Sequence, residues 1–186
     1  IMTEATLALL DGWQGAGSQP LDIPLEMMRL TQRIASRTLF NLDLSNEADT
    51  VGRTFTTLLA ALLKYTFVPF PPLWVPTPRN RRLQAGLETL NKVVYGIISE
   101  RRKRATDAGI DTGDLLSMLL AARDEETGEG MSDQQVRDEV MTLLLAGHET
   151  TSLALVWTWY LLSQHPDVEQ RLHAELDTVL AGQTPT

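Results

Sequence analysis

The sequence SDQQVRDEVMTLLLAGHETTSLALVWTWYLLS, residues 132–163, predicts one long central helix. Ser132 at the N-cap and Gln135 three residues later form the S-x-x-Q pattern of a capping box, and Met131 can pack against Val136 as a hydrophobic staple. Apolar residues occupy all faces of the helix on both sides of its centre. This pattern is typical of a helix that is enclosed by protein or lipid.

The centre of this helix is polar, with the sequence GHETTS at residues 147–152. A membrane span needs about 20 predominantly apolar residues, so the interruption argues against one. Gly147 costs about 1 kcal/mol of helix stability relative to alanine. An unpaired buried carboxylate is expensive, and threonine hydroxyls compete for backbone groups. Because several local rules are broken together, the segment indicates function.

The spacing of the polar residues indicates which function. Ala146 and Thr150 are four residues apart and therefore share one face of the helix. Gly147 leaves a groove beside the hydroxyl, and Glu149 lies about 100° further round, on a wetter side. Thr150 can also bond back to the carbonyl of Ala146, which predicts a local opening of the helix. The same face carries the apolar residues Leu143, Leu153 and Trp157.

This arrangement predicts that a flat apolar partner lies against the face, with one hydroxyl directed at it. It also predicts a proton route that has a carboxylate outside and a hydroxyl inside.

Two motifs in this region resemble a known family. AGHETT at residues 146–151 and LSQHP at residues 162–166 closely resemble the distal helix and following helix of a cytochrome P450. The family patterns are A/G-G-x-D/E-T-T/S and L-x-x-H-P. Residues 114–120, DLLSMLL, and the acidic RDEE at 123–126 resemble the approach to that helix. The resemblance covers most of the chain.

The resemblance implies a haem-dependent monooxygenase that activates O2 and hydroxylates an apolar organic substrate. Thr150 would be catalytic, hydrogen-bonding dioxygen and positioning the water that protonates it, while Glu149 would connect that water to bulk solvent. The expected cofactor is haem b, and the residues expected to contact it are Ala146, Gly147, Thr150 and Thr151. The residues expected to line the substrate pocket are Thr142, Leu145, Ala146 and Thr150.

Cysteine is absent from all 186 residues. Haem iron in this family is held by a cysteine thiolate, so the axial metal ligand is not in this sequence. We therefore expect residues 1–186 to be a partial cytochrome P450 domain that lacks its N-terminal part and its C-terminal haem-binding segment. These residues alone are not expected to be active.

The partners follow from the resemblance and from the charge. An electron-donor protein or reductase domain, O2 and an apolar small molecule are implied by the family. The net charge of −8 argues against a nucleic-acid partner. No signal peptide or anchor is visible, and a cytoplasmic location is expected.

Alternative functions leave different sequence signatures. His148 and Glu149 could begin a zinc H-E-x-x-H motif, but Ser152 occupies the position of the second histidine. A non-catalytic helical remnant or interaction module without haem is the main rival hypothesis. The sequence beyond Thr186 would distinguish the two, because an E-x-x-R helix and an F-x-x-G-x-x-x-C-x-G loop would support the enzyme.

The remaining sequence predicts further helices and no strand, so the expected fold is all-α. Pro166 at the first position, with acidic residues in the first turn, predicts the last helix. Asp111 is expected to cap a short helix. The basic cluster at residues 101–104 is interpreted mainly as a solvated face near a helix C-terminus, with an anionic partner as the alternative. The other predicted helices span residues 2–13, 22–42, 46–64, 78–105 and 111–122.

Residues 67–76 form a connector that carries four prolines and therefore interrupts any helix. The connector is also rich in apolar residues. Two interpretations stand open: a loop packed on its own core, or the roof of a substrate channel, which is the role of the corresponding connection in the family.

Overall fold

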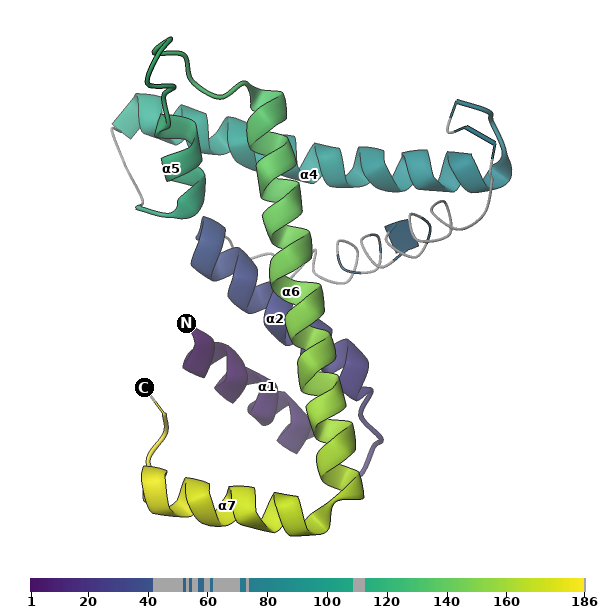
Figure 1. Ribbon diagram of the computed structural model, residues 1–186, viewed down its shortest axis with the longest axis vertical. Coiled ribbons are helices and arrows are strands. Elements are labelled where there is room, and N and C mark those ends of the chain that lie inside the picture. The colour runs from purple at the N-terminus through teal and green to yellow at the C-terminus, as the bar shows by residue number, and fades with distance from the viewer. Residues whose placement is uncertain are drawn as a thin grey trace. The chain divides into compact units, whose positions relative to one another are not determined.

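A computed structural model describes residues 1–41, 52, 54, 57, 58, 61, 71, 72, 74–108 and 113–185. Within these residues the secondary structure is helical, with no β-strand and one isolated bridge between Arg123 and Gly130 (Figure 1). The all-α expectation is confirmed. The predicted helix at 46–64 and most of the connector at 67–76 lie outside the described residues. The helices are α1 (Met2–Ala16), α2 (Ile23–Phe40), α4 (Pro78–Ala108), α5 (Leu115–Ala121), α6 (Asp133–Gln164) and α7 (Pro166–Leu180).

The chain divides into two compact units. One consists of Ile1–Ala35 together with Ala146–Thr186, and the other of Ser36–Leu145. The boundaries fall inside α2 and α6, so each of these two helices contributes residues to both units.

The unit formed by Ser36–Leu145 has a continuous apolar core. Its side chains recur seven or four residues apart on α4 and four residues apart on α6, which places each set on one helix face. All of the core residues are almost completely buried. They are Phe40, Leu58, Leu83, Leu90, Val94, Ile98, Leu116, Val136, Val140 and Leu144.

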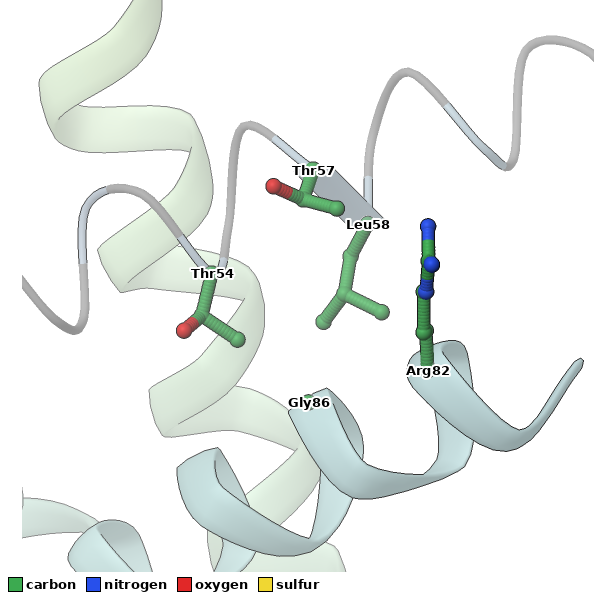
Figure 2. Close-up of a pocket in the computed structure, with 5 residues that line it drawn as sticks. All are labelled: Thr54, Thr57, Leu58, Arg82 and Gly86. Atoms are coloured by element: carbon green, nitrogen blue, oxygen red, sulfur yellow. The ribbon is translucent and has the colours of Figure 1, made fainter. Parts of the chain in front are cut away.

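Gly86 of α4 allows a close approach within this unit. A methyl group at Gly86 would lie 3.2 Å from the Thr54 Cγ2 atom and 3.6 Å from the Leu58 Cδ2 atom. These residues, with Thr57 and Arg82, line a shallow groove (Figure 2). The absence of a side chain at Gly86 therefore allows Thr54 and Leu58 to lie close to α4.

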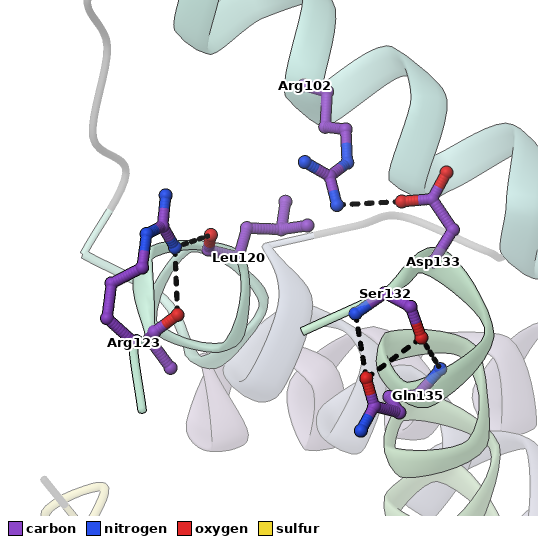
Figure 3. A network of polar contacts seen from close by, with 7 residues as sticks. Arg102, Leu120, Arg123, Ser132, Asp133 and Gln135 are labelled. Atoms are coloured by element: carbon purple, nitrogen blue, oxygen red, sulfur yellow. Dashed lines mark hydrogen bonds and ion pairs between the residues drawn. The ribbon is translucent and has the colours of Figure 1, made fainter. Parts of the chain in front are cut away.

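The start of α6 has the predicted capping box (Figure 3). The Ser132 amide donates to Gln135 Oε1 over 2.8 Å, and the Gln135 amide donates to Ser132 Oγ over 3.3 Å. Met131 and Val136 both pack in the apolar core, as expected of a hydrophobic staple. Arg102 adds an exposed ion pair with Asp133, with 2.7 Å between nitrogen and oxygen.

The start of α5 differs from the expectation. Its N-cap is Asp114, whose Oδ1 atom accepts from the Ser117 amide at 2.9 Å, and the helix begins at Leu115. The cap of this helix is therefore Asp114 and not the predicted Asp111, which lies outside the described residues. Gly113, with a φ of 63°, precedes the cap and turns the chain in a conformation that favours glycine.

Arg101 also differs from the expectation, because it does not belong to a solvated face. Its side chain is only 6% exposed and forms a buried ion pair with Asp114. Its guanidinium also donates to the Phe40 carbonyl over 2.8 Å and to Ser117 Oγ over 2.9 Å. The planar guanidinium can satisfy several acceptors at once, and it thereby links α4 to the end of α2 and to the start of α5.

We expect Arg101→Ala to lower the free energy of unfolding by about 3–5 kcal/mol, because it leaves the Asp114 carboxylate buried without its cation. The matched control is Arg102→Ala, which removes the exposed pair with Asp133 and should cost at most about 1 kcal/mol. Urea denaturation of the complete protein measures both. Equal losses for the two variants would contradict the buried network.

The unit formed by Ile1–Ala35 and Ala146–Thr186 is held by fewer buried side chains. The Trp13 indole donates to Glu26 Oε2 over 3.1 Å, which joins α1 to α2. Trp13 also meets Trp159 of α6 edge to face, with ring centroids 6.2 Å apart. Pro166 occupies the start of α7, as predicted, with acidic residues in the first turn.

By length and composition alone, α6 could cross a membrane, since a stretch of 18 residues within it has a mean hydropathy of 1.2. The core helix of a soluble protein meets the same criterion. Only 22% of that stretch is buried in the structure, but α6 also carries the buried polar residues His148 and Ser152, which would be costly in lipid.

Candidate active site

The polar centre of α6 directs its hydroxyl groups to its own backbone. Thr150 Oγ1 donates to the Ala146 carbonyl over 2.8 Å, and Thr151 Oγ1 donates to the Gly147 carbonyl over 3.2 Å. The predicted bond from Thr150 is confirmed. The predicted opening of the helix is not present, because α6 runs as one continuous helix from Asp133 to Gln164. A carbonyl oxygen has two lone pairs and can accept a hydroxyl without losing its helical amide.

The two sides of this segment differ in exposure. His148 and Ser152 are buried, at 1% and 6% exposure, and they share one face because they are four residues apart. Thr150 lies between them in sequence, about 200° round the helix from His148, and it is exposed. Ala146 and Gly147 are exposed as well. The hydroxyl of Thr150 therefore sits on the face opposite the buried one.

A residue of α2 contacts this buried face. Thr31, at 4% exposure, places its Oγ1 atom 3.0 Å from the His148 carbonyl oxygen, although 117 residues separate the two in sequence. Thr31 cannot be identified from the sequence, because a single threonine within MMRLTQR carries no motif. Only the fold brings it to α6.

The exposed face continues as an apolar stripe. Leu153 is 50% exposed and Trp157 is 57% exposed. Both fall on the Thr150 side of the helix by their spacing of three and seven residues. An apolar stripe that carries one hydroxyl suits a flat, largely apolar ligand.

Glu149 lies on the flank between the two faces, about 100° from Thr150. It is half-buried, and its Oε2 atom is buried without a hydrogen-bond partner among the described residues. A buried carboxylate oxygen without a partner is costly, so this atom is suited to accept a hydrogen bond from water or a ligand.

The two pocket residues predicted earlier in α6 belong to the other unit. Thr142 is exposed and donates its hydroxyl to the Asp138 carbonyl over 2.8 Å, while Leu145 is half-buried beside the apolar core. Within the part of the chain that the structure describes, no cluster of three or more histidine, aspartate or glutamate side chains could hold a metal ion.

Comparisons with known proteins identify the family of this chain. The family model for cytochrome P450 matches residues 1–186. Cyclooctatin synthase from Streptomyces melanosporofaciens is 41% identical over 169 residues, which are 90% of this chain and 36% of that protein. Cyclooctat-9-en-7-ol 5-monooxygenase from the same organism is 38% identical over 187 residues, covering 100% of this chain and 39% of that protein.

Solved structures give the same result. The crystal structure of the cytochrome P450DA haem domain matches all of this chain and 40% of that domain, with a TM-score of 0.80 and 32% sequence identity. The chain belongs to the cytochrome P450 family. It spans less than half the length of the relatives it matches.

The exposed face of α6 is compatible with the haem that defines this family. Ala146 has only a methyl side chain and Gly147 has none, so a flat macrocycle could approach the helix beside the Thr150 hydroxyl. The sequence contains no cysteine, so these residues can offer a face to the cofactor but not the axial thiolate.

We expect Ala146→Phe to lower the haem content of the complete protein without unfolding it, because the new ring would project from an exposed face into the space needed by the macrocycle. Ser163→Phe, at an exposed position near the end of α6, is the control. The measurement is absorbance of the carbon monoxide complex per mole of folded protein. Full haem content in Ala146→Phe would place the cofactor elsewhere.

Proposed function

We propose that the complete protein is a haem-dependent monooxygenase that hydroxylates an apolar organic substrate. The single observation that carries the proposal is the exposed Thr150 hydroxyl on the open face of α6, within a chain that belongs to the cytochrome P450 family. When bound, haem b would supply the activation of O2, which places one oxygen atom in the substrate and releases the other as water. Electrons would come from a donor protein or a reductase domain.

An apolar substrate is supported by the chain and by a relative. The stripe beside Thr150 is formed by apolar side chains, of which Leu153 and Trp157 are about half exposed. One relative is named for cyclooctat-9-en-7-ol, an unsaturated alcohol by its name. We propose that Thr142, Leu145 and Ala146 contribute to the wall of the substrate pocket.

Thr150 would act as the group that holds the proton-delivering water. Its hydroxyl now donates to the Ala146 carbonyl, so its oxygen lone pairs are available to accept from a water molecule on the exposed face. Ala146 and Gly147, with Thr151 on the flank, would contact the cofactor and leave room for that water.

Glu149 would link this water to solvent. Its side chain starts on the flank of α6, and one of its oxygens is buried without a partner among the described residues. A carboxylate in this position can accept a proton from solvent and pass it along a water chain toward Thr150 Oγ1.

Thr150→Ala tests this assignment in the complete enzyme. Alanine is the better helix former, so folding and haem content should survive. Transfer of a proton by a positioned group is typically worth about 10²- to 10⁴-fold. Here we expect product per reductant to fall by on the order of tenfold, with the remaining reducing equivalents released as hydrogen peroxide.

The control for this experiment is Thr158→Ala. Thr158 is also exposed, and its hydroxyl makes the same bond to the carbonyl four residues earlier, at 2.8 Å. It lies about 12 Å further along the helix axis and should leave product and peroxide unchanged. Unchanged coupling in Thr150→Ala would mean that Thr150 serves only the helix.

A further inference from the structure

The Thr31 hydroxyl makes a polar contact that joins α2 to the turn of α6 that carries Glu149 and Thr150. Three carbonyl oxygens lie near Thr31 Oγ1: those of Met27 at 2.9 Å, Met28 at 3.2 Å and His148 at 3.0 Å. The first two are the local contacts that a threonine within a helix commonly makes. The third joins two helices and is not dictated by local sequence.

The Thr31 hydroxyl has one proton and three carbonyl acceptors within hydrogen-bonding range. The bond to His148 is therefore one branch of a shared hydrogen bond. Because Thr31 is 4% exposed, water has little access to replace this branch.

The bond from Thr31 reaches α6 directly beside the two proposed site residues, Glu149 and Thr150. The His148 carbonyl belongs to the peptide group that joins His148 to Glu149, and Thr150 is the next residue. A helix is rigid over one turn. A hydrogen bond that fixes the His148 carbonyl therefore also fixes the direction of the Thr150 side chain on the opposite face. Thr150 lies about 200° round from His148, on the exposed side.

We propose that Thr31 is a positioning residue, whose bond to the His148 carbonyl holds the turn that presents Glu149 and Thr150. This inference rests on the proposed function of Thr150. Thr31 touches neither substrate nor cofactor; it acts through the backbone of α6. A small rotation of this turn would displace the Thr150 hydroxyl from the water that it holds, and positioning errors of this kind lower proton-transfer efficiency.

The test compares Thr31→Val, which keeps the shape of the side chain and removes the hydroxyl, with Thr31→Ser, which keeps the hydroxyl. The complete haem enzyme is used, and product and peroxide are measured per reductant consumed. Thr31→Val should raise peroxide release by a few fold, less than Thr150→Ala does, and Thr31→Ser should restore the coupling of the unmodified enzyme. Thr38→Val, the same change at an exposed position of α2, should have no effect.

A second readout does not involve activity. Hydrogen exchange of the backbone amides at residues 149–152 should be on the order of fivefold faster in Thr31→Val, the factor that corresponds to one hydrogen bond of typical net strength. The same amides should exchange at the original rate in Thr31→Ser and in Thr38→Val. If Thr31→Val does not fold, Thr31→Ala removes the same hydroxyl and does not put a methyl group in its place.

The double variant Thr31→Val/Thr150→Ala distinguishes a failure of the inference about Thr31 from a failure of the proposed function of Thr150. If Thr31 acts through Thr150, the double variant should couple no worse than Thr150→Ala alone. Uncoupling by Thr150→Ala without any effect of Thr31→Val would overturn this inference and leave the proposed function standing. Normal coupling in Thr150→Ala would overturn the proposed function first. Additive losses would assign Thr31 to general packing.

Discussion

Burial of His148 and Ser152 against protein determines which side of α6 faces outward. A helix turns about 100° per residue, so once these two side chains are inside, Thr150 must lie near the opposite side. The Thr31 hydroxyl, 3.0 Å from the His148 carbonyl, adds a directional bond to this packing. The exposed hydroxyl and the apolar stripe around it are thus a geometric consequence of the buried face on the other side of the helix.

Sequence reasoning was most successful where local chemistry decides the structure. The capping box of Ser132 and Gln135 specifies the start of α6 by local hydrogen bonds, and Pro166 starts α7 for a similar reason. The bond from Thr150 to the Ala146 carbonyl is equally local. Such features need only residues within one helical turn, and for that reason they could be read directly.

Most of the failures share a physical cause, which is the influence of distant residues. Arg101 appeared to be one of four solvated basic residues, yet Asp114, Ser117 and the Phe40 carbonyl enclose it. Asp111 and Asp114 are both of a residue type that caps helices. The N-cap in the structure is Asp114, which also pairs with Arg101. Thr31 could not be found at all, since its acceptor lies 117 residues away. The predicted opening of α6 overestimated how strongly a threonine hydroxyl competes with a helical amide.

We propose that haem lies against the Ala146–Thr150 side of α6, opposite His148 and Ser152. A crystal structure of the complete protein with its haem tests this directly. We expect the macrocycle to contact Ala146 and Gly147 on the side of α6 that carries the Thr150 hydroxyl, while Thr31 remains bonded to the His148 carbonyl. A macrocycle packed on another face of α6, or a Thr150 side chain buried in protein away from it, would show that this assignment is wrong.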